Sequence, residues 1–213
     1  GIKMLGKEDT AVKGNFLSAF AMFIAVAITV VSVIDPLIFL IGIALGAIIG
    51  SSIALKVKMT SIPEMVALFN GFGGLATFLI AWSEFNSIPD SLFQHILIVI
   101  TVFIGGVTFT GSLIAYGKLS EKIKIAKTSI ITKIFTTVFY TSLIFLIYSI
   151  VQPVMPILDF DFFTVLLVLT LLAGIGFVLP IGGGDMPVVI SLLNSLSGIA
   201  AAFAGLLLLN NVL

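Results

Sequence analysis

The stretch LPIGGGDMPVVISLLNSLSG, residues 179–198, lies between two long apolar segments of the chain. Within it, three consecutive glycines precede Asp185, and Asn194 follows nine residues later, inside the second apolar segment. An apolar segment of about 20 residues is long enough to cross a bilayer as a helix. The stretch therefore predicts a loop between two membrane helices, and it places a polar amide inside the second of them.

The composition predicts a membrane protein with several spans. Hydrophobic residues make up 60% of the 213 residues and charged residues 9%, whereas soluble domains carry about 25% charged residues. The absence of cysteine excludes a disulfide framework and cysteine-ligated metal sites, and a single histidine excludes a histidine-rich metal site. No basic stripe with interleaved aromatics points to nucleic acid. We therefore expect an all-α, polytopic transmembrane helix bundle in a lipid bilayer, with no metal site.

Seven apolar segments predict seven spans within a single transmembrane domain covering residues 1–213. The breaks between the segments are polar or carry proline. Pro63 and Pro187 fall in the first turns of their helices, where the missing N–H costs little. The predicted spans are residues 15–34, 37–55, 63–82, 92–117, 129–151, 161–181 and 186–208.

The lysines predict the orientation of the bundle. With seven alternating spans, all ten basic residues fall on one side of the membrane. The positive-inside rule assigns that side to the cytoplasm or its equivalent. We therefore expect the amino end inside and the carboxyl end outside. The chain starts without the apolar core of a signal peptide and stops within an apolar run, so we expect a piece of a longer polypeptide or complex.

Two of the predicted helices form an internal repeat. The stretch PEMVALFNGFGGLATFLIA, from Pro63, aligns with PVVISLLNSLSGIAAAFAG, from Pro187. The pairs that match at an offset of 124 residues are Pro63 and Pro187, Leu68 and Leu192, Asn70 and Asn194, Gly74 and Gly198, and Ala76 and Ala200. Small and apolar residues match easily between membrane helices, but proline, asparagine and glycine at fixed spacing favour a real repeat in parallel orientation.

The two repeat asparagines, Asn70 and Asn194, lie about 10 Å into their helices, at 1.5 Å per residue. A buried amide at that depth needs hydrogen-bond partners, because an unmade bond in hydrocarbon is costly. Two interpretations follow. The asparagines bond neighbouring helices as structural contacts worth about 0.6 kcal/mol, or they line a hydrated path. Ser112, in VTFTGS, adds a hydroxyl that can donate and accept in a chain of water molecules.

The charged groups of interest lie at the predicted inner ends of helices. Glu64 and Asp185 begin the two repeat helices, so each is either a first-turn acid stabilised by the helix dipole or a functional carboxylate. Gly182, Gly183 and Gly184 before Asp185 allow positive φ, a hinge, or the close approach of another surface. The loop lacks the Gly-Lys-Ser/Thr of phosphate loops, and no GxGxxG is present.

Two further features concern packing at the membrane and between helices. Lys118 is expected to anchor the inner end of its span at the membrane interface. Gly42, Gly46 and Gly50 fall on one face of a predicted helix, which predicts the close approach of a neighbouring helix. The small residues of IGGVTFTGS, among them Gly105, Gly106 and Gly111, likewise predict helix packing in the span 92–117.

Three of these motifs, taken together and in order, resemble one family. LPIGGGDMPVVISLLNSLSG, VTFTGSLIAYGKL and MTSIPEMVALFNGFGGLA resemble the beta-subunit membrane domain of the proton-translocating nicotinamide nucleotide transhydrogenases. The resemblance covers residues 59–204 specifically. It implies that hydride transfer from NADH to NADP⁺ in two soluble domains is coupled to inward proton movement through this membrane domain. The complete protein is expected in the cytoplasmic membrane of a bacterium or in the mitochondrial inner membrane.

The resemblance also implies partners and residue roles. The expected partners are an NADP(H)-binding domain, an NAD(H)-binding subunit, alpha-subunit membrane helices and a second copy of the complete enzyme. This chain itself is expected to bind neither nucleotide and to hold no catalytic residue for hydride transfer. Asp185, with its glycines, looks like the family's loop acid facing the NADP(H) domain. Asn194 and Ser112 look like the channel asparagine and serine, and Glu64 matches a further acid of the family.

Asn70 departs from the family pattern, because many members have a functional histidine at this position. Either the titrating group comes from another subunit's helix, or this chain does not gate protons. We favour the first interpretation, because some members carry the histidine on a different helix. Two other functions remain open on the residues alone: a secondary transporter or channel for a small solute, and a purely structural membrane subunit.

Overall fold

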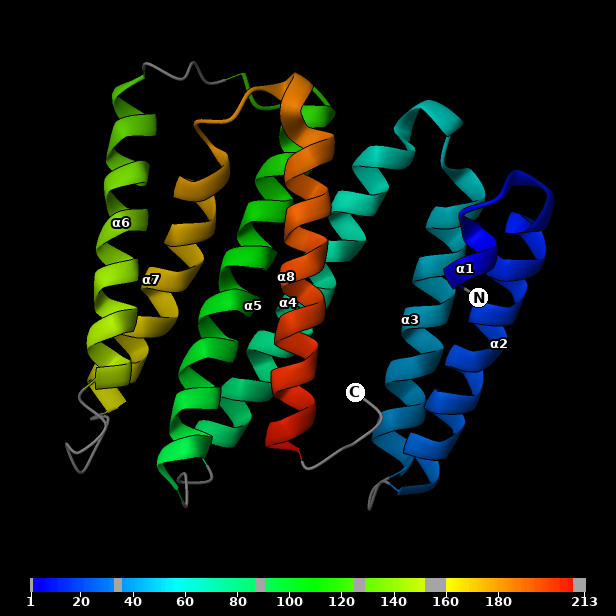
Figure 1. Cartoon of the computed structure of the whole chain (residues 1–213), viewed down its shortest axis with the longest axis horizontal. Helices are drawn as coiled ribbons and strands as arrows, with labels where there is room; N and C mark the ends of the chain where they lie inside the picture. Colours follow the sequence, from blue (N-terminus) through cyan, green and yellow to red (C-terminus); the bar gives the residue numbers. More distant parts are fainter. Residues whose placement is uncertain (1, 33–35, 87–90, 125–128, 152–159, 209–213) are drawn as a thin grey trace. The chain divides into compact units, whose positions relative to one another are not determined.

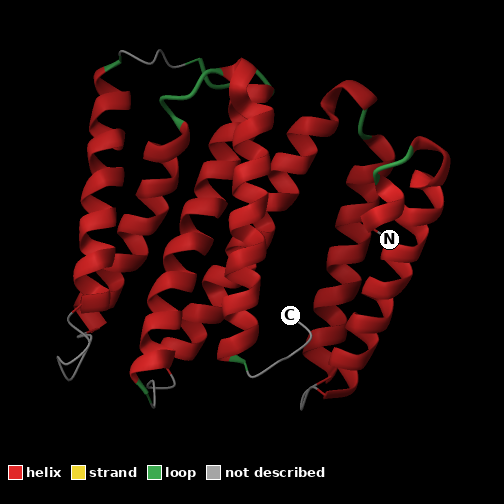
Figure 2. Ribbon diagram, in the orientation of Figure 1, coloured by secondary structure: helices red, strands yellow, loops and turns green. Residues whose placement is uncertain are grey.

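The structure, a computed structural model, describes residues 2–32, 36–86, 91–124, 129–151 and 160–208. Within these ranges all regular structure is helical, as Figures 1 and 2 show. The predicted all-α class with seven long helices is therefore confirmed. The chain divides into two compact units, Gly1–Val57 and Lys58–Leu213, and each is described by itself.

The first unit consists of a short helix and two long ones, α1 Ile2–Leu5, α2 Glu8–Ser32 and α3 Pro36–Lys56. Helix α2 begins several residues before the predicted apolar span, because its first turn carries acids that favour a helix N-terminus. Most large apolar side chains on α2 and α3 are exposed. In water that would be costly, but it suits helices whose surroundings are lipid or other membrane helices.

The glycine face of α3 does not take part in close packing within the described residues. A Cβ placed on Gly42, Gly46 or Gly50 would meet no other atom within 4 Å. The helix packing predicted at Gly105, by contrast, is found in the second unit.

The second unit is a five-helix bundle with two short 3₁₀ turns. Its elements are η1 Met59–Ser61, α4 Ile62–Asn86, α5 Leu92–Leu119, α6 Ile130–Val151, α7 Phe160–Val178, η2 Gly183–Asp185 and α8 Met186–Leu207. Successive helices run in opposite directions (Figure 1). The N-termini of α4, α6 and α8 and the C-termini of α5 and α7 therefore lie at one end, called here the lysine-bearing end because it holds Lys118, Lys122 and Lys124.

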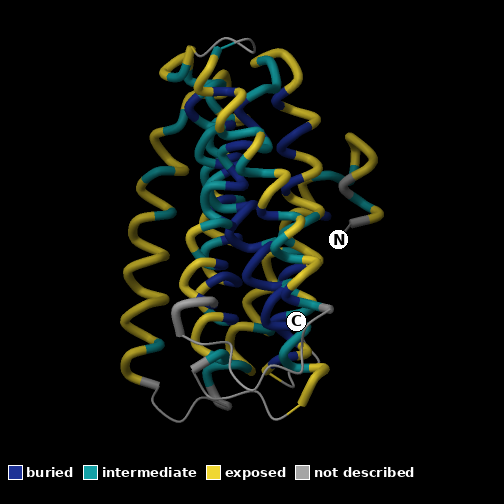
Figure 3. The backbone as a smooth tube through the Cα atoms, turned by 90° about the vertical axis from the view of Figure 1, so that its left-hand side faces the viewer, coloured by how far each residue is buried: buried dark blue, intermediate teal, exposed yellow. Residues whose placement is uncertain are grey.

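Helix α5 lies at the centre of this bundle. It packs against α4, α7 and α8, while α6 packs mainly against α7. Of the apolar window of α5, 67% is buried, against 11% for α6. Figure 3 shows the buried residues gathered along the interior and the exposed residues on the outer surfaces. A membrane helix that is covered on most sides by other helices can carry polar side chains away from lipid.

Six described helices are long and apolar enough to cross a membrane, namely α2, α3, α4, α5, α6 and α8. The seventh long helix, α7, is apolar over Phe163–Val178 in the described residues, which is shorter than the 18 residues of such a span. The chain is therefore an integral membrane protein with multiple apolar helices. The predicted orientation, with the amino end inside and the carboxyl end outside, stays a prediction from the positions of the lysines.

Two glycines set the distance between α4 and α5. A Cβ on Gly74 would lie 2.8 Å from the backbone N of Phe109 and 2.9 Å from the carbonyl O of Gly105. A Cβ on Gly105 would in turn lie 2.8 Å from the N of Phe78. The obstacles are backbone atoms, which cannot rotate away as a side chain can. The absence of a side chain at both positions therefore allows the two helix backbones to touch.

Replacing Gly74 with alanine is expected to destabilise the protein by about 1–3 kcal/mol, because the added methyl forces the two backbones apart. Gly73→Ala is the matched control, since Gly73 is exposed and has open space around its Cβ position. Its effect is expected to be neutral or stabilising by up to about 1 kcal/mol through helix propensity. Thermal unfolding of the purified protein in detergent measures both, and equal melting temperatures would contradict the close crossing.

Candidate functional site

A polar network joins three helices inside the second unit. The side-chain amide of Asn70, on α4, donates to the hydroxyl of Ser112, on α5, with Nδ2 and Oγ 2.9 Å apart. The hydroxyl of Ser197, on α8, donates to the amide oxygen of Asn70, with Oγ and Oδ1 also 2.9 Å apart. Ser112 is fully buried, and Asn70 and Ser197 are half-buried. The amide thus bridges two hydroxyls on different helices.

Small residues on α4 bring Ser112 into reach of Asn70. A Cβ on Gly71 would lie 3.2 Å from the Cβ of Ser112, so the missing side chain lets the two helices approach at this level. Gly71 is one residue beyond Asn70 and one turn before the close crossing at Gly74. The same backbone contact that joins α4 to α5 therefore places the amide and the hydroxyl at bonding distance.

The network has a direction that can reverse. Ser197 donates to Asn70, and Asn70 donates to Ser112. A serine hydroxyl both donates and accepts, and an amide offers one oxygen and one NH₂. Rotation of the amide by half a turn and of both hydroxyls would keep both hydrogen bonds with the opposite direction. The arrangement can order water and hydroxyl groups, but neither asparagine nor serine titrates near neutral pH.

The structure does not bring Asn194 into this network. Asn194 is exposed and makes no hydrogen bond within the described residues. It shares its face of α8 with Ser191, Ser195 and Gly198, which are also exposed and follow helical spacing. The two repeat asparagines therefore have different surroundings: Asn70 is bonded between helices, and Asn194 lies on a polar outer face of the bundle.

Ser197 is the network residue that the sequence interpretation missed. The signal was its position on the inward stripe of α8. Leu193, Ala200 and Ala204 are buried, and Ser197 falls between them at steps of four and three residues, which is the spacing of one helix face. A polar residue on an otherwise buried apolar stripe indicates a partner on a neighbouring helix.

Asp185 lies at the lysine-bearing end, at the N-cap position of α8. Its side chain makes no capping hydrogen bond, and the residue is exposed. Asp185 N donates only to the carbonyl O of Gly182, at 3.1 Å, within the 3₁₀ turn. Asp185 therefore stands where the helix dipole favours an acid, but its carboxylate makes no N-cap hydrogen bond and is exposed.

The glycines before Asp185 expose the loop backbone, because they have no side chains to cover it. No described glycine has positive φ, and Gly182 is extended at φ −70° and ψ 155°. A Cβ on Gly183 or Gly184 would meet no atom within 4 Å. The loop backbone therefore does not need glycine for its own conformation, and its exposed peptide groups are open to close approach by another surface.

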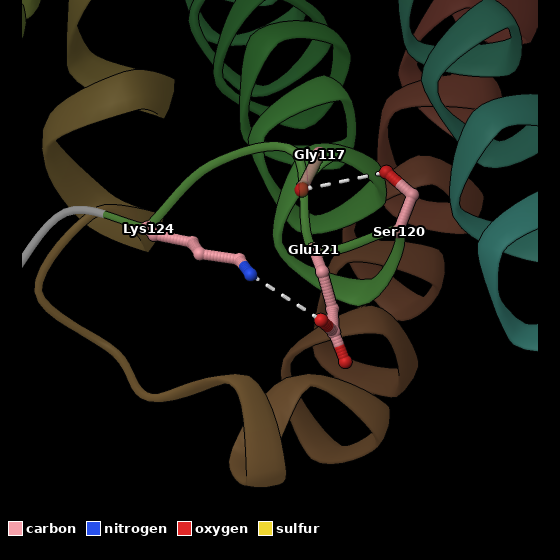
Figure 4. Close-up of polar contacts among 4 residues, drawn as sticks. All are labelled: Gly117, Ser120, Glu121 and Lys124. Atoms are coloured by element: carbon pink, nitrogen blue, oxygen red, sulfur yellow. Dashed lines mark hydrogen bonds and ion pairs between the residues drawn. The ribbon is translucent and has the colours of Figure 1, made fainter.

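Glu64 lines a hollow at the same end of the bundle. The hollow has a volume of about 470 Å³ and is bounded by Glu64, Tyr116, Leu119, Ser120, Glu121 and Lys122. At the end of α5, Ser120 donates to the carbonyl O of Gly117 at 3.4 Å, and Glu121 pairs with Lys124 at 3.4 Å (Figure 4). That ion pair is solvent-exposed, so its contribution to stability is small.

Lys118 does more than anchor the end of α5. Its Nζ donates to three backbone carbonyls at the end of α7 and the start of the loop, those of Val178, Leu179 and Ile181. The ammonium group thus caps the C-terminus of α7, where cations are favourable.

This chain is similar to a family of known proteins and to two curated relatives. The family described as the NAD(P) transhydrogenase beta subunit matches residues 1–213. Two relatives from Rhodospirillum rubrum, both named NAD(P) transhydrogenase subunit beta, are 32% identical to this chain over 226 aligned residues. The alignment covers 100% of this chain and 47% of each relative. The chain thus spans about half the length of the curated relatives it matches.

Replacing Asn70 with alanine is expected to destabilise the protein by about 1 kcal/mol, because it removes two interhelical hydrogen bonds and leaves the buried Ser112 hydroxyl without its donor. The matched control is Asn194→Ala, which removes the same amide from an exposed position and is expected to change stability by less than about 0.5 kcal/mol. Chemical unfolding in detergent compares the two. Equal losses would argue against the network as an interhelical contact.

Proposed function

The chain belongs to the NAD(P) transhydrogenase beta subunit family and forms a membrane-embedded part of such a subunit. We propose that it carries protons in a complete NAD(P) transhydrogenase. In this proposal, soluble domains transfer hydride from NADH to NADP⁺ while protons move inward through the helix bundle. The observation that carries the proposal is the Ser197–Asn70–Ser112 network, which crosses three helices in the interior of the bundle.

The composition of this polar network favours a role in a proton path over a role in helix packing alone. Two serines and an asparagine meeting inside one membrane bundle give several exchangeable hydrogens and lone pairs in a row. Water molecules beside the half-buried Ser197 and Asn70 can continue it. Since none of the three groups titrates near neutral pH, they order the path, and the group that takes up and releases the proton belongs to a partner.

The outer face of α8 indicates where that partner packs. Ser191, Asn194, Ser195 and Gly198 are exposed along this face, and polar side chains facing lipid are costly. Small and polar residues at such spacing are typical of contacts between membrane helices. We assign this face to a membrane helix of the alpha subunit, which would bring a titratable side chain near Asn194 and cover the path from the outside.

Asp185 is the residue that we assign to coupling. It lies exposed after the bare glycines Gly182, Gly183 and Gly184, where the backbone of an NADP(H)-binding domain could approach closely. Helix α8 runs directly from Asp185 to Ser197, a distance of about 18 Å at 1.5 Å per residue. A change of loop position caused by nucleotide occupancy would thus reach the network through one rigid element. Glu64, in the hollow at the same end, is a second candidate.

Hydride chemistry is assigned to other parts of the complete enzyme. The chain has no GxGxxG or phosphate-loop sequence, so its residues do not fit an NAD(H) or NADP(H) site. Within the described residues, no group of three or more histidine or acidic side chains could hold a metal ion. The proposed complete enzyme includes an NAD(H)-binding subunit and a second copy of itself. Its proposed location is a bacterial cytoplasmic membrane or the mitochondrial inner membrane.

The proposal is tested with the complete enzyme in sealed vesicles, by following NADPH-driven reduction of a nicotinamide analogue together with internal pH. Reduction should be accompanied by a pH change that an uncoupler abolishes. Ser197→Ala is expected to lower proton movement at least fivefold, because it breaks the network. Ser142→Ala is the matched control: Ser142, on α6, is buried and donates to the carbonyl O of Phe139 in its own helix, so coupling should be unchanged.

Absence of both reduction and pH change in intact complexes that bind nucleotide would contradict the proposed function. Uptake of a small solute by this chain alone would instead favour a secondary transporter. Equal effects of Ser197→Ala and Ser142→Ala on proton movement would remove the network from the path.

Asp185→Asn is expected to change NADP(H) release and proton-coupled turnover at least tenfold, because it removes the exposed charge that we assign to the contact with the nucleotide domain. Glu121→Gln is the control, since Glu121 is an exposed acid at the same end that pairs with Lys124. Stopped-flow measurement of nucleotide release and steady-state rates compares the variants. Unchanged release in Asp185→Asn would exclude the coupling role.

A further inference from the structure

Lys118 connects the central helix of the bundle to the loop that carries Asp185. The residue lies in the last turn of α5. Its Nζ is 3.3 Å from the carbonyl O of Val178 and 2.5 Å from each of the carbonyl O atoms of Leu179 and Ile181. All three acceptors belong to one short segment, in which α7 ends and the glycine loop begins.

The chemistry of this segment explains why an ammonium group fits there. The last carbonyls of an α-helix lack intrahelical donors and carry the negative end of the helix dipole. Pro180 lies within the segment and has no N–H to offer to them. A lysine ammonium has three N–H donors and a positive charge, so Lys118 provides the donors that the local backbone lacks.

The loop beyond this segment has few contacts of its own. Gly183 and Gly184 have open space around them, and the side chain of Asp185 makes no capping bond. The backbone contributes the bonds from Ile181 N to Val178 O and from Asp185 N to Gly182 O, both 3.1 Å. Val178 and Leu179 are buried, so packing also holds the start of this segment, and Lys118 adds a polar connection from it to α5.

We propose that Lys118 is a positioning residue that fixes the glycine loop to α5, so that Asp185 and the Ser112 end of the network keep a set relative position. Lys118 follows Ser112 on α5 by six residues, about 9 Å along the helix. The tether makes α5 a second connection between the loop and the network, besides α8. This inference deepens the proposed function and rests on it for its consequence in coupling.

Lys122 offers a matched comparison. It lies one turn further along at the same end of the bundle, and it is exposed. Its Nζ lies 3.3 Å from the hydroxyl of Tyr116 and 5.2 Å from the centre of the Tyr116 ring. Removing its charge alters the same surface of the protein without touching the carbonyls of the loop.

The tether itself is tested by hydrogen–deuterium exchange on the complete enzyme in detergent. Lys118→Met should raise the exchange of backbone amides in residues 179–185 at least tenfold, because the segment loses its bridge to α5. Lys118→Arg, which keeps the charge and the donors, should remain within threefold of the original protein, as should Lys122→Met. Unchanged exchange in Lys118→Met would overturn the proposal.

Lys118→Gln is measured beside these variants, because the neutral glutamine amide keeps two N–H donors. It also tests the tether if Lys118→Met does not assemble. Lys118→Gln is expected to raise exchange in residues 179–185 by about half as much as Lys118→Met does, on a logarithmic scale. Exchange equal to that of the original protein would again overturn the tether.

The consequence for coupling is tested by the number of protons moved per hydride transferred in sealed vesicles. Lys118→Met should lower this ratio at least threefold, Lys118→Arg should restore at least half of it, and Lys122→Met should leave it unchanged. A purely structural role would lower both rates in parallel and leave the ratio unchanged, which would overturn the positioning role. If the original enzyme moves no protons, the proposed function fails, while the exchange measurement still decides whether the tether exists.

Discussion

The backbone contact between α4 and α5 at Gly74 and Gly105 is the constraint on which the rest of the second unit depends. Without side chains at these two positions, the helices approach until backbone atoms touch. One turn away, this distance places the Asn70 amide 2.9 Å from the Ser112 hydroxyl. A hydrogen bond weakens steeply when its atoms separate by more than a few tenths of an ångström. The polar network therefore depends on residues that contribute no polar atom.

Helix α5 combines the functions of core element and connector. Its buried face holds Ser112, and its last turn holds Lys118. Below the loop, an apolar cluster of Ala67, Ala115, Val178, Met186, Val189, Ile190 and Leu193 joins α4, α5, α7 and α8. Such a packed cluster transmits displacement better than a flexible surface would, because close-packed interiors are poorly compressible. The network, the loop and the lysine-bearing end are thus linked through one central helix.

The repeat helices α4 and α8 show how the same sequence pattern acquires different roles. Gly74 lies at a close helix crossing, whereas a Cβ on its repeat partner Gly198 would meet no atom within 4 Å. Asn70 bridges two serines, whereas Asn194 is exposed. Because α4 and α8 occupy unequal places around α5, equal motifs face different neighbours. The exposed polar face of α8 is typical of a membrane helix that packs against a further helix.

The sequence by itself determined the helical class, the number of long helices and the candidate residues Asn70, Ser112 and Asp185, because hydropathy and the need to satisfy polar groups in lipid are local properties of the chain. It also indicated helix packing at Gly105, which lies at the crossing with α4, and at Gly42, Gly46 and Gly50, which have no close neighbour within the first unit. Only the tertiary structure decided which glycines touch, that Ser197 completes the network, and that Lys118 holds the loop. Those pairings join residues 42, 127 and about 60 positions apart, and spacing along one helix cannot tell which face of a distant helix will be its neighbour.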